Sequence, residues 1–184
     1  MSKRAAGILL PITSLPSKYG IGCFSKCAYD FVDWLKDAGQ TFWQILPICP
    51  TSFGDSPYQS FSTFAGNPYF ISLEALIEEG VLTEEECAAV NFGTNPIDID
   101  YEAMYYGRYP LLRMAYERSN ISQDHDYQVF VAENKWWLSD YALFMALKDR
   151  FGGKSWNEWP EDIRLRHGYA LDYYRRELYF DIEF

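Results

Sequence analysis

The sequence predicts an α/β fold that begins with one βαβ unit and continues as a mostly helical segment. Two short runs rich in apolar and β-forming residues, 7–12 and 41–47, enclose one amphipathic stretch. After Tyr69 the apolar residues recur with the period of helices instead. A strand, a helix and a strand of these lengths make a βαβ unit, so the two strands are expected to be parallel.

The amphipathic stretch carries its own start and stop signals. Ser25 is a favourable N-cap residue, and Gly39 is a typical C-terminal stop. Between them, apolar residues at i, i+3, i+4 and i+7 predict one buried helix face: Ala28, Phe31, Val32 and Leu35.

The rest of the chain predicts helices separated by irregular segments. Thr83 to Glu86 reads as a capping box that starts a small helix. Asp98 and Asp100 alternate in an extended stretch, which favours an exposed edge over an acid–base pair. Longer helices are expected over 102–118 and 127–150, and a last one from about Glu161. Their expected core faces comprise Tyr105, Leu112, Ala115 and Tyr116 in the first, and Phe130, Asn134, Trp137, Leu138, Tyr141 and Met145 in the second.

The segment 50–69, which follows the second strand, has an unusual composition. It holds seven Gly, Pro, Asn and Asp residues, which forbid a long helix or a central strand, and five aromatic rings. Flat rings beside neutral hydrogen-bonding groups suit a sugar, which stacks its C–H face and bonds its hydroxyls laterally. A loop packed by its own side chains is the alternative. The small polar groups are Thr51, Ser52, Ser56, Gln59, Ser60 and Asn67.

The position of this loop strengthens the binding interpretation. Ligands of α/β sheets gather at the loops beyond the carboxyl ends of the strands. The turn-rich loop 13–22 and the loop 50–69 both follow strands.

Composition limits the classes of partner. The 184 residues carry a net charge of −10, which argues against nucleic acid, because that partner requires clustered Lys and Arg. Hydrophobic residues make up 48%, which argues against disorder. No run reaches the length of a membrane span, and the first residues lack the apolar core of a signal peptide. A soluble, cytoplasmic protein is expected.

Neither a metal site nor an activated nucleophile is predicted. The cysteines lack C-x-x-C spacing, and only two histidines, His125 and His167, exist to complete a zinc site with them. Small thiols of this kind usually pack as hydrophobic residues. There is no G-x-S-x-G motif.

The chain also reads as the first part of a larger domain. Two parallel strands are too few to form a stable sheet that is covered on both faces. The last residues, 171–184, keep a helical apolar pattern without a stop signal. A complete, mostly helical domain is the alternative.

Three runs carry a resemblance to a known family. G-I-L-L-P-I-T-S-L-P-S-K-Y-G-I-G, then D-S-P-Y-Q-S-F-S-T-F-A-G-N-P-Y, and later W-W-L-S-D-Y-A-L-F-M-A-L-K resemble the amino-terminal part of 4-α-glucanotransferases, the amylomaltases of glycoside hydrolase family 77. The resemblance extends from Gly7 to Phe184. It implies a TIM (β/α)₈ barrel, incomplete in this chain, with a helical insertion. It also implies transfer of an α-1,4-glucan segment to an acceptor's 4-hydroxyl with retention, and no cofactor.

The resemblance implies sugar-binding residues but no catalytic ones. The family's nucleophile, acid/base and stabilising carboxylates lie on later strands, so no catalytic residue is assigned and the chain alone is expected to be inactive. Tyr58 matches the tyrosine that stacks on the donor sugar, and Asp55, Ser56 and Gln59 surround it. Phe53 matches a position where some members carry a tyrosine of a second, remote glucan site.

Two segments are therefore expected: residues 1–69 as the first βαβ unit with its sugar-binding loop, and residues 70–184 as the helical insertion. The expected partners are α-1,4-glucans and the missing carboxyl-terminal half of the barrel. Two other interpretations remain, a stand-alone glucan-binding module and a protein-interaction domain derived from the barrel.

Overall fold

The computed structural model describes residues 4–52, 54–95 and 97–184, and it divides into two compact units. The first unit extends to Ser119, and the second covers Asn120–Phe184. Each is described by itself. The helices 73–118 thus belong to the same unit as the strands, and the expected division after Tyr69 into a βαβ part and an insertion stays a prediction.

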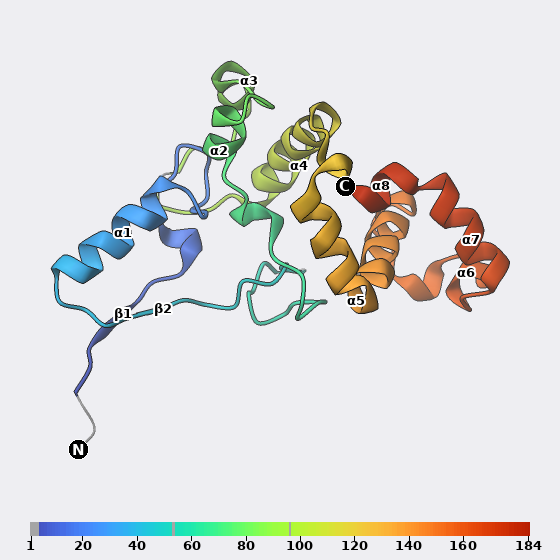
Figure 1. Cartoon of the computed structure of the whole chain (residues 1–184), viewed down its shortest axis with the longest axis horizontal. Coiled ribbons are helices and arrows are strands. Elements are labelled where there is room, and N and C mark those ends of the chain that lie inside the picture. Colours follow the sequence, from blue (N-terminus) through green and yellow to red (C-terminus); the bar gives the residue numbers. More distant parts are fainter. Residues whose placement is uncertain (1–3, 53, 96) are drawn as a thin grey trace. The chain divides into compact units, whose positions relative to one another are not determined.

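The first unit begins with the expected parallel βαβ arrangement (Figure 1). Strand β1 (Gly7–Leu9) pairs in parallel with β2 (Phe42–Gln44), with Gly7 opposite Phe42, and α1 (Lys26–Asp37) connects them. Both strands are shorter than expected. Pro11 has no N–H to donate and the chain turns into the short helix η1 (Ile12–Ser14), while beyond Gln44 the described chain offers no further ladder partner.

Helix α1 buries a narrower face than its sequence suggests. Ser25 is the N-cap residue as expected, although its side chain makes no capping hydrogen bond. Ala28 and Leu35 are buried, but Val32 is 49% exposed, which corrects the expected stripe. The reason is the small size of the sheet: α1 packs through Phe31 against Trp43, with ring centroids 4.9 Å apart, and two strands cannot cover the rest of the face.

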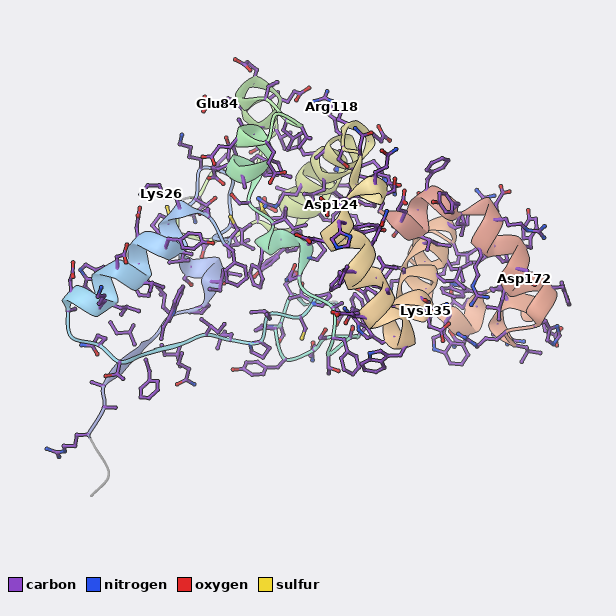
Figure 2. All side chains as sticks on the ribbon, viewed as in Figure 1. Lys26, Glu84, Arg118, Asp124, Lys135 and Asp172 are labelled. Carbon is purple, nitrogen blue, oxygen red and sulfur yellow. The ribbon has the colours of Figure 1, made fainter. Side chains whose placement is uncertain are left out.

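Short helices continue the first unit: η2 (Pro68–Phe70), α2 (Leu73–Glu78) and α3 (Glu84–Ala88). The expected capping box is confirmed, because Thr83 Oγ1 accepts from Glu86 N and Glu86 Oε2 accepts from Thr83 N. Glu86 also accepts two hydrogen bonds from Arg118, labelled in Figure 2 at the end of α4. These bonds tie α3 to α4.

Helix α4 (Tyr101–Arg118) supplies the main core of the first unit. Leu112 and Ala115 are buried as expected, but Tyr105 is 50% exposed. A buried arginine explains the error, because it occupies the centre of the true core face and so hides the apolar period. That face consists of Met104, Gly107, Arg108, Leu111, Leu112 and Ala115.

All regular elements of the second unit, in the part of the chain described, are helices. They comprise η3 (Ile121–Gln123), α5 (His125–Arg150), η4 (Trp156–Glu158), α6 (Glu161–Arg164), α7 (Gly168–Glu177) and α8 (Tyr179–Glu183). Helix α5 matches expectation in extent, but its fully buried residues are Leu143, Ala146 and Leu147 rather than the expected stripe, of which Phe130 is 48% exposed.

The prediction of a single last helix from Glu161 is wrong. Three helices occupy this segment, and Arg166 adopts a positive φ of 57° at the first break. There the N–H of His167 donates to Asp162 O at 2.9 Å and that of Arg166 to Ile163 O at 3.0 Å, which is a C-terminal capping pattern. A non-glycine residue in this conformation gives no strong stop signal in the sequence.

No helix in the described residues combines the length and the apolar character needed to cross a membrane.

Candidate functional site

The loop between β2 and η2 is irregular, as expected, but both of its ends are held. The N–H of Asn67 donates to Ile48 O at 2.8 Å, which brings the two ends of the loop together. The side chain of Asn67 is buried and accepts from Tyr69 N at 3.0 Å. This bond caps η2, so Asn67 joins the loop to the helical part of the unit.

Two consecutive turns form the centre of the loop. The N–H of Asp55 donates to Ser52 O, and the N–H of Gln59 donates to Ser56 O, both at 3.0 Å. The hydroxyl of Ser52 closes the pair by donating to Gln59 O at 2.6 Å. Asp55 has a φ of 54°, a left-handed conformation that aspartate tolerates better than most residues. The backbone on either side of Tyr58 is therefore fixed by three hydrogen bonds.

Tyr58 is one of the most exposed aromatic side chains of the unit. Its side chain is 72% exposed, and its N–H donates to Ser56 Oγ at 3.3 Å. Pro57 restricts the backbone on its amino side. Gln59, the next residue, is exposed as well. An exposed ring beside an exposed amide, on a loop held at its ends, is suited to stacking against a flat ligand.

Asp55 lies in a different environment from Tyr58. It is half-buried, and burial raises the pKa of its carboxyl. Burial and then the charge of Asp55 raise the pKa of Tyr69 to about 12 and also raise that of Tyr101. Asp55 is thus close enough to these two tyrosines to act on them electrostatically, whereas Tyr58 is largely in solvent.

Four of the five expected sugar-binding residues therefore share one loop: Asp55, Ser56, Tyr58 and Gln59. Ser56 is half-buried, and its hydroxyl already accepts from Tyr58 N. Phe53 lies outside the described residues.

Helix α4 packs against η2, where the loop ends, and contributes residues that the sequence analysis missed. Tyr69 packs against Tyr101 and Tyr109 of α4, with ring centroids 6.3 and 6.1 Å apart. Arg108, between these tyrosines in sequence, is fully buried. The sequence did carry a signal for this buried arginine. Arg108 follows Met104 by four positions and precedes Leu112 by four, so it lies in the centre of an otherwise apolar helix face.

The described residues hold no group of three or more His, Cys, Asp or Glu side chains that could ligate a metal ion. The four cysteines are free, and burial raises the pKa of the Cys23 and Cys87 thiols, so these two remain protonated near neutral pH. Asp98 and Asp100 are exposed, as expected. Asp100 caps α4 by accepting from Ala103 N, and Asp98 accepts from Asn95 Nδ2.

Known proteins resemble the chain over nearly its whole length. The family model Glyco_hydro_77, described as 4-alpha-glucanotransferase, matches residues 10–184. A 4-alpha-glucanotransferase of Streptococcus pneumoniae is 47% identical over 180 residues, which cover 97% of this chain and 36% of that protein. A 4-alpha-glucanotransferase of Clostridium butyricum is 48% identical over 173 residues, which cover 94% of this chain and 36% of that protein.

A solved structure has the same fold over this region. The amylomaltase from Streptococcus agalactiae in complex with acarbose matches with a TM-score of 0.91 and 42% identity. The match covers 98% of this chain and 37% of that one. The chain thus spans about a third of the length of the relatives it matches.

Proposed function

Because the chain belongs to the 4-alpha-glucanotransferase family of glycoside hydrolases, we propose that it is the amino-terminal part of such an enzyme and carries the platform that binds the donor glucan. The observation that carries the proposal is the exposed Tyr58 ring on a loop whose backbone is tied by hydrogen bonds on both sides. A ring held in place loses little conformational entropy when a sugar stacks on it. The acarbose bound by the related amylomaltase, a glucan analogue, supports the same class of ligand.

The other members of the platform have distinct parts in this proposal. Gln59 is exposed, so its amide can bond sugar hydroxyls beside the ring. Ser56 holds the backbone of Tyr58 and offers its hydroxyl as a second contact. Burial, and then the charge of Asp55, raise the pKa of Tyr69 and Tyr101, and we assign the Asp55 carboxylate as an acceptor for a sugar hydroxyl. Phe53 is assigned to the remote glucan site on the resemblance alone.

We further propose that β1, α1 and β2 form the first βαβ unit of a (β/α)₈ barrel. Their parallel register supports this, because all strands of such a barrel are parallel. The remaining strands and the catalytic carboxylates would belong to the two thirds of the relatives' length that this chain does not span. A retaining mechanism needs two carboxyl groups about 5 Å apart across the scissile bond, and no Asp or Glu of this chain is assigned to that pair.

The experiment is a calorimetric titration of the 184-residue chain with maltoheptaose. Tyr58→Ala should weaken binding about threefold to tenfold, since aromatic contacts contribute about 0.5–1.5 kcal/mol beyond area burial. Tyr58→Phe should bind almost like the unsubstituted chain, because it keeps the ring. Tyr29→Ala is the matched control, because Tyr29 on α1 is also 72% exposed.

Equal affinities of the Tyr58→Ala and Tyr29→Ala variants would show that Tyr58 is not the platform. Absence of any heat of binding at millimolar maltoheptaose would remove the glucan-binding function from this chain and favour a protein-interaction domain.

Activity provides a second test. The chain alone is expected neither to hydrolyse maltotriose nor to convert it to longer and shorter maltooligosaccharides. Chromatography of the sugars after overnight incubation measures this. Scrambling of chain lengths that survives removal of host enzymes would contradict the expectation.

A further inference from the structure

We propose that Arg108 is a positioning residue that links the loop after β1 to the segment directly after η2, and through η2 to the loop after β2. One buried guanidinium bonds a main-chain carbonyl in each of these two segments. The consequence for glucan binding rests on the proposed function, whereas the link between the loops does not.

The contacts of Arg108 reach far along the chain. Its Nη1 donates to Tyr19 O at 3.4 Å, and its Nη2 donates to Ile71 O at 2.5 Å. Tyr19 lies in the loop that follows β1 and η1, and Ile71 directly follows η2, where the Tyr58 loop ends. A single side chain from α4 thus bonds both the loop after β1 and the residue that follows η2.

The chemistry of the site argues that Arg108 does more than fill the core. Its side chain is fully buried, and burial lowers its pKa, with Glu74 among the groups that oppose this effect. Both hydrogen bonds go to neutral carbonyls rather than to a carboxylate. The buried Nε of Arg108 has no hydrogen-bond partner among the described residues, so burial of this charge costs free energy that an apolar side chain of similar length would not. What an apolar side chain lacks is the planar fork that bonds two acceptors at once.

Packing contacts connect Arg108 to the loop after β1 and to the Tyr58 loop. Gly20, next to Tyr19, lies against α4 so closely that an added Cβ would be 2.3 Å from Met104 Cε. On the other side Tyr109 packs on Tyr69, which is bonded to Asn67. Asn67 in turn closes the Tyr58 loop through Ile48 O. A shift of Arg108 is therefore expected to move both the loop after β1 and the Tyr58 loop.

The test compares two substitutions of Arg108 with a control on the same helix. Arg108→Met keeps the length and loses the donors, Arg108→Lys keeps the charge and one donor group, and Leu112→Ala removes buried volume from the same core without touching either carbonyl. Amide hydrogen exchange of the 184-residue chain is the first measurement. Its reporters are the bonded amides of Gly22, Phe24 and Asn67.

We expect Arg108→Met to accelerate exchange at these amides about tenfold relative to the other amides of the unit, because loss of the link opens the loops locally. Arg108→Lys should have an intermediate effect. Leu112→Ala should accelerate exchange throughout the unit without preference for the loops. If Arg108→Met and Leu112→Ala give the same pattern, Arg108 is a core residue and the proposal is wrong. Should Arg108→Met not fold, the same comparison is made between Arg108→Lys and Leu112→Ala.

Maltoheptaose affinity is the second measurement. Arg108→Met should weaken binding about threefold to tenfold, as loss of the Tyr58 ring does, and Arg108→Lys should restore part of it. If exchange at the loop amides rises but affinity is unchanged, Arg108 does not position the sugar platform. If the unsubstituted chain does not bind maltoheptaose, the proposed function fails while the exchange data still decide whether Arg108 links the loops.

Discussion

The ionisation of Glu86 is coupled to the fold of the first unit. Hydrogen bonds from Arg118, and then the backbone bond from Thr83, lower its pKa to about 2. Because the pKa in the folded chain lies below the ordinary value of 4.5, the ionised carboxylate stabilises the fold above pH 4.5. That contribution is lost as the pH falls from about 4.5 to about 2. Both side chains are partly exposed, so solvent screening keeps the effect modest.

Glu86→Gln should therefore flatten the pH dependence of stability between pH 4.5 and 2. Glutamine can still accept the Thr83 N–H, so the capping box survives while the charge pair with Arg118 is lost. Urea unfolding at several pH values, with Glu86→Gln compared to Glu85→Gln, measures this. Glu85 is exposed on the same helix. A Glu86→Gln variant with the pH profile of the Glu85→Gln variant would contradict the prediction.

At the scale of elements, the connection from β1 to α1 depends on one close backbone approach. A Cβ added to Gly22 would lie 2.1 Å from Ile12 O and 2.7 Å from Leu15 N, both in or beside η1. Gly22 also donates from its N–H to Thr13 O at 3.1 Å. A side chain here has to displace backbone rather than the flexible end of a side chain.

Gly22→Ala should accordingly destabilise the first unit by about 1–3 kcal/mol, the usual cost of overpacking. The matched control is Gly66→Ala, where an added Cβ meets no atom within 4 Å. That change is expected to be neutral or to stabilise by up to about 1 kcal/mol. Hydrogen exchange of the slowest amides of the unit measures the change in unfolding free energy for each of the two substitutions. Equal effects of the two substitutions would show that the turn adapts without strain.

At the scale of the whole molecule, the β1–β2 sheet leaves apolar surface and unpaired strand edges in the described part of the chain. Leu9 is 57% exposed and Phe42 is 61% exposed. Exposed edges and apolar patches of this kind promote association between chains. In the proposed barrel this surface would be covered by the remaining strands.

The 184-residue chain, prepared by itself, should therefore self-associate as its concentration rises. Sedimentation velocity should show species larger than the 21.5 kDa monomer. Phe42→Lys should shift the population toward monomer, whereas Ile97→Lys should not, although Ile97 is 87% exposed in a loop. A monomer at every concentration would show that this surface is not adhesive.

Much of the local structure could be predicted from the sequence, because its causes lie within a few residues. The Thr83–Glu86 capping box, the extent of α5 and the irregular loop around Tyr58 each follow from groups at most a few positions apart, such as Pro57 and Gly54. The family could be recognised for the same reason, since its motifs are contiguous.

Only the tertiary structure decided which faces are buried and how the loops are held. Val32 and Tyr105 are exposed although their spacing suggested a core, and Arg108 is buried although arginine side chains are mostly exposed in folded proteins. The partners that decide these outcomes lie far away in sequence, 37 and 89 residues from Arg108 for its two carbonyls. The period of apolar residues in the sequence indicates that a helix has one apolar face. Whether that face is buried depends on which distant segment of the chain covers it.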